Sequence, residues 1–304
     1  MPSTADLSRW PMQRIEVRTR DTLVDPLIAA WHLPLGREEA PARPCVVLVH
    51  GLTGCEGSFY VLETAYHLLS AGYPVIRANL RGAGPSRAVC RGHYCAGSSA
   101  DLDDLLFGLP EAAVADGLVL VGYSLGGNIA LKHLAEAGES ANIACAVTIS
   151  APIELSAAAR RMMAPRNRLY HRWLLARMKE EALAGASAVS DEEKRAIERA
   201  RSVYEYDALF IAPRFGFDGA DDYYERCSAA GMLRDIRRPT LLLHARDDPW
   251  IPAASYADAV SAPLSNVTAI VAPGGGHVGF HGRDRETPWH NLCLCTFIEK
   301  HTGE

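Results

Sequence analysis

Apolar and polar positions change their spacing along the chain in a regular order. Residues 12–18 and 23–33 alternate well enough to predict an opening pair of antiparallel strands. The apolar run at 45–49 is continuous, which is typical of a parallel strand covered on both faces. Further short runs then alternate with stretches of helical spacing. This alternation predicts an α/β fold with a mostly parallel central sheet and helices on both faces.

The later elements follow the same order up to residue 150 and again from residue 239. The predicted strands are 73–79, 119–121, 143–150, 240–244 and 267–271, and the predicted helices are 59–70, 99–115, one ending at Gly138, 253–260 and 289–300. Residues 151–235 are helical in pattern and charged, and they contain no strand-like run. We therefore predict a core of residues 1–150 and 236–304 with a helical cap, 151–235, inserted over the carboxyl edge of the sheet.

The junction after the run 119–121 carries the clearest chemical signal. Ser124 lies between Gly122 and Gly126, and a helical pattern follows directly. Gly-x-Ser-x-Gly between a strand and a helix is the pattern of a nucleophile elbow, a sharp turn that exposes the serine hydroxyl. The glycines avoid collisions where strand and helix pass closely. The sequence therefore predicts Ser124 as a catalytic nucleophile.

A serine nucleophile needs a base and an orienting acid, which follow in the chain order Ser, Asp or Glu, His. Asp247 and Asp248 come directly after one late strand, and His277 comes after the next, within a glycine-rich loop. Hydrolases with such an elbow often place the acid four residues before a proline, and Asp248 fits this Asp-x-x-apolar-Pro pattern with Pro252. We therefore favour Asp248 as the acid and leave Asp247 as the alternative. Other late histidines fit less well, namely His244, His281 and His290.

The tetrahedral oxyanion formed by serine attack needs preorganised donors, usually backbone N–H groups. The amide of Leu125, directly after the nucleophile, is one predicted donor. The amide of Leu52, after His50 and Gly51, is the other. His50 itself either binds substrate or shapes this loop through hydrogen bonds, and we favour the second role.

Composition narrows the class of protein. The 304 residues are 48% hydrophobic and 22% charged with a net charge of −5, which describes a globular protein and gives no reason to expect nucleic acid as a partner. No apolar run is long enough for a transmembrane segment and the first residues lack a signal-peptide profile, so we expect a cytoplasmic protein. The eight cysteines are expected to be reduced, because most lie singly in apolar runs.

No cofactor or metal is expected from the motifs. Cys90-x-x-His93-x-Cys95 and Cys293-Leu294-Cys295 lack the paired spacing of a zinc site. The glycines at 274, 276 and 279 formally match a dinucleotide fingerprint, but no helix pattern follows them. We therefore expect a small-molecule ester as the only ligand that the chemistry requires.

The segment 160–179 has seven basic residues and no acidic one, interleaved with apolar residues. It is either a cap helix whose apolar face covers the active site, which we favour, or a weak contact with an anionic membrane surface. Candidates to line the substrate pocket are Met162, Leu169, Trp173, Phe215 and Trp250.

Taken together, these motifs resemble the YheT-like family of α/β-hydrolases. The resemblance rests on motifs spread over nearly the whole chain: His50-Gly51-Leu52 with Gly54 and Tyr60, Asn79-Leu80-Arg81-Gly82, Tyr94 with Gly97 and Asp101, Gly122 to Asn128, Ser150-Ala151-Pro152, Tyr206-Asp207, Tyr223-Tyr224, Asp247-Asp248-Pro249, and Gly275 to Phe280. It implies a Ser-Asp-His carboxylester hydrolase for short to medium acyl esters, with some relatives acting on lipids. Relatives in higher organisms carry a membrane anchor before the hydrolase domain, and we expect no such anchor here.

The sequence thus predicts a serine carboxylesterase that works through an acyl-enzyme. Thioester hydrolysis or acyl transfer would use the same triad, because the choice of acceptor depends on the shape of the cap and on access of water. A non-catalytic binding protein is the third hypothesis, and it would require a lost triad member or a blocked oxyanion loop. Oligomeric state and acyl length are not encoded in these patterns.

Overall fold

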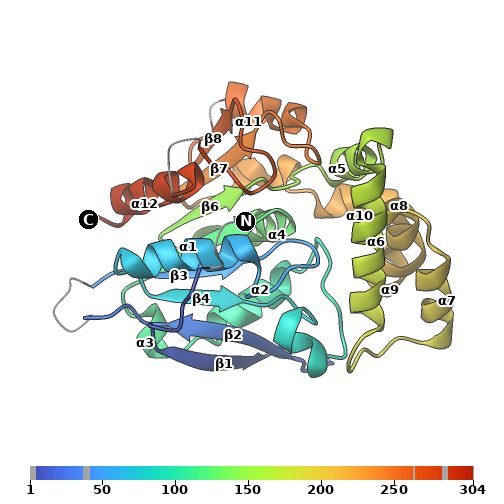
Figure 1. The fold of residues 1–304 in the computed structure, drawn as a ribbon, viewed down its shortest axis with the longest axis horizontal. Helices are drawn as coiled ribbons and strands as arrows, with labels where there is room; N and C mark the ends of the chain where they lie inside the picture. Colours follow the sequence, from blue (N-terminus) through green and yellow to red (C-terminus); the bar gives the residue numbers. More distant parts are fainter. Residues whose placement is uncertain (1–4, 37–41, 263, 283–286, 304) are drawn as a thin grey trace.

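The chain is built around one mixed β-sheet (Figure 1). The computed structural model describes residues 5–36, 42–262, 264–282 and 287–303. Within these residues the sheet has eight strands in the order β1-β2-β4-β3-β5-β6-β7-β8. The strands are β1 (Met12–Arg18), β2 (Pro26–His32), β3 (Cys45–Val49), β4 (Val75–Ala78), β5 (Leu118–Tyr123), β6 (Cys145–Ile149), β7 (Thr240–Ala245) and β8 (Val267–Ala272).

The first two strands run against the rest of the sheet. β1 pairs antiparallel with β2, from Met12 opposite His32 to Arg18 opposite Pro26, and β2 pairs antiparallel with β4. Every later pair, from β4 with β3 to β7 with β8, is parallel. The predicted α/β fold with an antiparallel opening and a mostly parallel sheet is therefore confirmed.

Helices cover both faces of the sheet. The helices of the described chain are α1 (Phe59–Ser70), α2 (Ser99–Phe107), α3 (Glu111–Val114), α4 (Leu125–Ala137), α5 (Leu155–Met162), α6 (Arg168–Leu183), α7 (Asp191–Arg199), α8 (Val203–Tyr206), α9 (Ala212–Arg214), α10 (Ala220–Cys227), α11 (Ala257–Ser261) and α12 (Trp289–Thr302). Buried side chains of α1 and α12 belong to one apolar cluster, and those of α2 and α4 belong to the other.

The continuous apolar run of β3 is explained by this double cover. Val46 and Leu48 point into the cluster shared with α1, whereas Val47 and Val49 point into the cluster shared with α4. Because successive side chains of a strand point to opposite faces, both sets must be apolar. All four side chains are fully buried.

Two predicted helices are interrupted. The stretch 99–115 divides into α2 and α3, because Pro110 has no N–H to continue the helix and restricts the residue before it. Gly108 also lies so close to β1 that a Cβ there would be 2.4 Å from a methyl group of Val17. The stretch 253–260 begins as a 3₁₀ turn, Ala253–Tyr256, before α11.

Residues 151–235, all of them described, contain helices and no strand. Figure 1 shows α5 to α10 gathered at one end of the sheet, with α6 as the longest element. One turn, Asp207–Ile211, is a π-helix between α8 and α9. None of the helices in the described part of the chain is both long and apolar enough to span a bilayer.

Candidate active site

Ser124 lies at the turn between β5 and α4. Its backbone has φ 48° and ψ −122°, a left-handed conformation that costs energy for any residue with a side chain. The neighbouring glycines permit it. A Cβ on Gly122 would lie 2.6 Å from the Cα of Gly127, and one on Gly126 would lie 2.3 Å from the carbonyl oxygen of His50. Only glycine fits at these two positions, and the turn raises the serine above the sheet.

His277 links the serine to an aspartate. Its Nε2 lies 3.0 Å from the Ser124 hydroxyl oxygen, and its Nδ1 lies 2.8 Å from Oδ2 of Asp248. The loop after β8 carries His277, with Gly276 in a left-handed conformation at φ 62°. With the proton on Nδ1 donated to Asp248, Nε2 is free to accept the serine proton. The three side chains, which come from the turns and loops after β5, β7 and β8, therefore form one continuous hydrogen-bonded chain.

Asp248 is held as a carboxylate. Its side chain is 1% exposed, and burial alone would raise the pKa of the carboxyl. The hydrogen bond from His277 and those from the amides of Trp250 and Ile251, at 2.8 and 3.0 Å, outweigh burial and lower the pKa below its usual value. An ionised Asp248 can stabilise the imidazolium that forms when His277 takes a proton.

Asp247, the alternative acid, has a different position. It is exposed, and its Oδ1 accepts a hydrogen bond of 2.9 Å from the amide of Gly276. It therefore contacts the histidine loop through the backbone, while the imidazole of His277 is bonded to Asp248. The two neighbouring aspartates thus contact different groups of the same loop.

The predicted oxyanion donors lie beside the serine. The loop after β3 approaches so closely that a Cβ on Gly51 would be 2.9 Å from the Ser124 Cβ. In the described chain, neither the amide of Leu52 nor that of Leu125 donates a hydrogen bond to another protein group. Two unused N–H groups flanking a serine hydroxyl suit a developing negative charge.

Sequence reasoning did not single out the groups that hold this loop. The Tyr60 hydroxyl accepts a hydrogen bond of 2.9 Å from the Gly51 amide, and the Tyr94 hydroxyl accepts one of 2.8 Å from Thr53, a residue at φ 55°. The Tyr94 hydroxyl in turn donates to Glu181 on α6 at 3.0 Å. Both tyrosines occur in the family motifs, but spacing along the chain does not indicate which amide a distant hydroxyl meets.

His50 lies next to backbone groups of this loop and of the loop after β4. It is fully buried, and burial lowers the pKa of its imidazole to about 4. Its Nε2 accepts a hydrogen bond of 3.1 Å from the amide of Leu80, and its Nδ1 lies 2.7 Å from the carbonyl oxygen of Gly51. A neutral imidazole that bridges two backbone groups fits the structural role favoured from the sequence.

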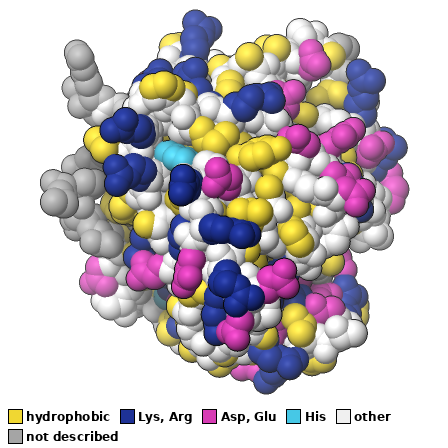
Figure 2. All heavy atoms as spheres, turned by 90° about the vertical axis from the view of Figure 1, so that its right-hand side faces the viewer, with side chains coloured by type: hydrophobic (Ala, Val, Ile, Leu, Met, Phe, Trp, Pro, Cys, Tyr) yellow, Lys and Arg dark blue, Asp and Glu magenta, His cyan; other side chains and the backbone are white. Residues whose placement is uncertain are grey.

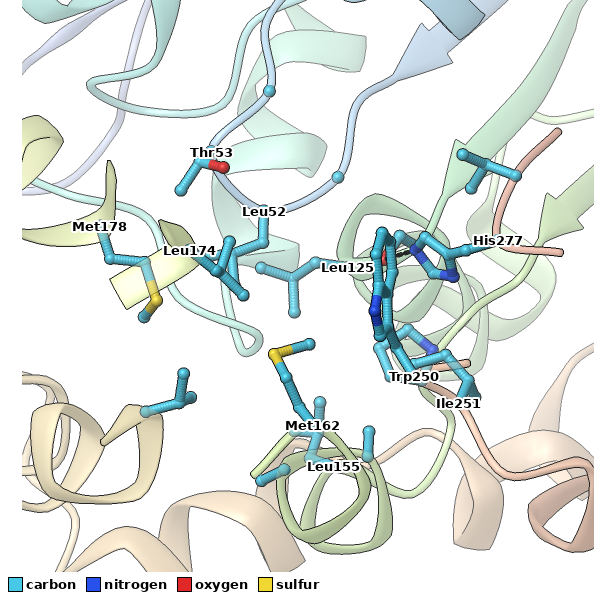
Figure 3. A pocket seen from close by; sticks show the side chains of 18 of the residues that line it. Leu52, Thr53, Leu125, Leu155, Met162, Leu174, Met178, Trp250, Ile251 and His277 are labelled. Carbon is cyan, nitrogen blue, oxygen red and sulfur yellow. Dashed lines mark hydrogen bonds between the residues drawn. The ribbon is translucent and has the colours of Figure 1, made fainter. Parts of the chain in front are cut away.

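A chamber of about 440 Å³ opens next to the serine, lined mostly by apolar side chains (Figure 3). Its walls come from the loops at the sheet edge, including Leu52 and Leu125, and from the helical segment 151–235. In Figure 3, Leu174 and Met178 lie on the side of the chamber away from His277. The size and apolar lining suit a small to medium hydrocarbon chain.

Trp250 forms the wall next to the histidine. Its ring centroid lies 4.4 Å from that of His277, and the ring stacks on Tyr170 of the helical segment at 3.8 Å. Met162, Trp173 and Trp250 line the chamber as expected from the sequence. Two other candidates lie elsewhere: Leu169 is 80% exposed and Phe215 packs against the apolar core.

The cysteine and histidine side chains considered as metal ligands have separate partners. The Cys90 thiol donates a hydrogen bond to the carbonyl oxygen of Pro26. The Nε2 of His93 lies 3.0 Å from the carbonyl oxygen of Ala182. Over the described ranges, no three His, Cys, Asp or Glu side chains gather as a ligand set.

Comparison with known proteins identifies the family. A family model for the alpha/beta hydrolase fold matches residues 44–284. The YheT protein of Escherichia coli (strain K12) is 32% identical over 80% of this chain and 72% of its own length. The chain belongs to the YheT-like α/β-hydrolases.

A second relative is named as a phospholipase, and a solved structure shows the same fold. Phospholipase ABHD3 of Mus musculus is 26% identical over 86% of this chain, and the match spans 63% of the length of ABHD3. An esterase of Pyrococcus furiosus shares the fold with a TM-score of 0.64 and 17% identity, covering 97% of this chain and 93% of the esterase. The predicted α/β-hydrolase fold is thereby confirmed.

Proposed function

We propose that this YheT-like hydrolase is a serine carboxylesterase for short- to medium-chain acyl esters. The observation that carries the proposal is the hydrogen-bonded row of Ser124, His277 and Asp248 at the mouth of an apolar chamber. Relatives named as a putative esterase and a phospholipase support the same reaction class.

In the proposed reaction, His277 removes the proton of Ser124 as the hydroxyl attacks the ester carbonyl carbon. The amides of Leu52 and Leu125 stabilise the oxyanion, and Asp248 stabilises the imidazolium. The imidazolium then donates its proton to the leaving alcohol, and water hydrolyses the acyl-enzyme by the same steps. In this proposal residues 151–235 act as a cap whose inner face binds the acyl chain.

Hydrolysis of p-nitrophenyl esters of increasing acyl length tests the proposal. We expect turnover of short and medium chains and its loss in Ser124→Ala, with the variant still folded by circular dichroism. Acyl thioesters and added alcohol acceptors extend the series. Wild-type inactivity on every oxygen ester, or unchanged turnover in Ser124→Ala, would refute the esterase; exclusive turnover of thioesters would assign the triad to thioester hydrolysis instead.

A contact between the segment 160–179 and an anionic lipid surface is part of the proposal. Leu169 and Trp173, one turn apart on α6, are 80% and 55% exposed, and the arginines at 166, 168 and 172 are exposed beside them. Figure 2 shows basic, acidic and hydrophobic side chains interspersed on this side of the molecule. Such a surface favours a weak contact near the chamber over firm insertion.

A further inference from the structure

Asp207 is a buried carboxyl that the proposed triad does not use. It belongs to the helical segment and is the first residue of the π-helix Asp207–Ile211. Its side chain is only 7% exposed, yet it lines the main chamber. It also lines an adjoining side cavity of about 40 Å³ together with Leu52, Leu125 and Met178. A π-turn of this kind is often found at functional sites.

The two oxygens of this carboxyl have different environments. Oδ2 accepts a hydrogen bond of 2.6 Å from the hydroxyl of Tyr224. Oδ1 has no hydrogen-bond partner among the described residues. It is not fully enclosed either, so part of its surface is accessible. Asp207 lines both cavities and is only 7% exposed, so we infer that its accessible Oδ1 faces them.

Among the described residues, no positive charge compensates for this burial. Burial raises the pKa of Asp207 to about 7, and the hydrogen bond from Tyr224 offsets only part of that rise. No lysine or arginine in the described ranges forms an ion pair with it. A buried carboxyl with a vacant acceptor costs free energy unless a ligand supplies a donor, so retaining it in an apolar chamber favours a specific ligand group.

The geometry of the proposed reaction indicates which part of a substrate approaches Asp207. His277 must donate its proton to the oxygen of the leaving alcohol. The alcohol portion of the ester therefore lies on the side of His277 and Trp250. The acyl chain then leads away past the oxyanion amides of Leu52 and Leu125. In Figure 3 this direction leads toward Met178, and these three residues line the side cavity with Asp207.

We propose that Asp207 is a specificity residue that binds a hydroxyl group, or another hydrogen-bond donor, on the far end of the substrate's acyl chain. The preferred substrates are then esters of ω-hydroxy acids rather than of plain alkanoic acids. The donor binds Oδ1 while Tyr224 holds Oδ2. This inference rests on the proposed esterase function and names the substrate class of the same site.

The test compares p-nitrophenyl esters from butanoyl to dodecanoyl with their ω-hydroxy counterparts, with Ser124→Ala as the blank for spontaneous lactone formation. At the chain length that reaches Asp207, we expect kcat/KM to favour the ω-hydroxy ester roughly tenfold or more, the effect of a hydrogen bond to a buried acceptor. Asp207→Leu should reverse the preference toward the methyl-terminated ester. Asp207→Asn keeps an acceptor oxygen and should retain part of the preference.

Asp221→Asn is the matched control, because Asp221 is an exposed aspartate on α10 outside both cavities. It should keep the wild-type ratio. Each ratio compares two esters on one variant, so partial loss of folded protein cancels. A ratio near or below one at every length, or an unchanged ratio in Asp207→Leu, would overturn the inference while plain esters remain substrates. If no oxygen ester of either series reacts, the esterase function fails first, and the inference with it.

Discussion

The loop after β7 and the helical segment each contain one buried aspartate, Asp248 and Asp207, and the two carboxyls are stabilised differently. Asp248 accepts hydrogen bonds from one imidazole and two backbone amides, which lower its pKa despite burial. Asp207 accepts one from a tyrosine hydroxyl, and burial raises its pKa to about 7. Burial of the two carboxyls is thus accompanied by pKa shifts in opposite directions, and the hydrogen-bond donors and the imidazole around each carboxyl decide the direction.

This difference separates two kinds of role. A carboxyl whose two oxygens both accept hydrogen bonds is held in its charge and orientation, as a residue that orients a histidine must be. A carboxyl with an accessible oxygen in a cavity is left to interact with whatever enters. The following predictions test whether the two aspartates behave in these separate ways.

The largest expected effect concerns the loop aspartates. Asp248→Asn removes the charge that stabilises the imidazolium and favours the wrong tautomer of His277, so kcat should fall by about 10³–10⁴-fold. Asp247→Asn is the matched control and should lose less than about tenfold, because its contact is with a backbone amide. Steady-state hydrolysis of one p-nitrophenyl ester measures both. A larger loss in Asp247→Asn would reverse the assignment.

The second prediction concerns Asp207 and stability. Folding raises its pKa from 3.8 to about 7, so the folded protein binds more protons than the unfolded chain in this window. The contribution to the free energy of unfolding is fully present below pH 3.8 and is lost as pH rises to about 7, by roughly 2–4 kcal/mol. Asp207→Asn should therefore gain stability relative to wild type over that range.

Urea unfolding of both proteins at several pH values measures this difference. Burial also raises the pKa of Glu181 to about 7. Its contribution to the pH dependence of stability is the same in both proteins, so it cancels in the difference. Asp248 contributes in the opposite sense, since its lowered pKa stabilises the fold above pH 3.8, and it cancels as well. Parallel stability curves for the two proteins would show that Asp207 titrates like an exposed carboxyl.

The third prediction concerns the connection between the two regions. Tyr94→Phe leaves the Thr53 amide without an acceptor and releases Glu181 of α6 from the oxyanion loop. We expect kcat to fall about tenfold with little change in KM, because a displaced loop affects the transition state more than binding. Tyr66→Phe removes a hydroxyl from a partly exposed tyrosine outside the site and should have no effect. A rise in KM alone would place Tyr94 in substrate binding.

The smallest effect is expected near the start of α6, where Leu169 is exposed and the partly exposed Trp173 also lines the chamber. Replacing both Leu169 and Trp173 with alanine should reduce co-sedimentation with phosphatidylserine vesicles roughly threefold at low salt. Leu183→Ala, at the other end of α6 and 41% exposed, is the control. Equal vesicle binding by the wild type, the double variant and Leu183→Ala would show that Leu169 and Trp173 do not contact the lipid surface.

Local patterns along the chain were enough to predict the fold and much of the candidate site. The apolar runs and helical spacings predicted the strands and most helices, and the glycines around Ser124 indicated a strand-to-helix turn. The order of the loops indicated Asp247, Asp248 and His277. These features depend on neighbouring residues, so the sequence alone carries them.

Tertiary structure decided the contacts between distant segments. It paired Asp248 rather than Asp247 with His277, brought the hydroxyls of Tyr60 and Tyr94 to the oxyanion loop, and turned Leu169 outward. It also placed Asp207 in the chamber lining, with one carboxyl oxygen that has no hydrogen-bond partner among the described residues. Each outcome depends on which side chains from remote elements fill the space around a group, and no local spacing encodes that packing.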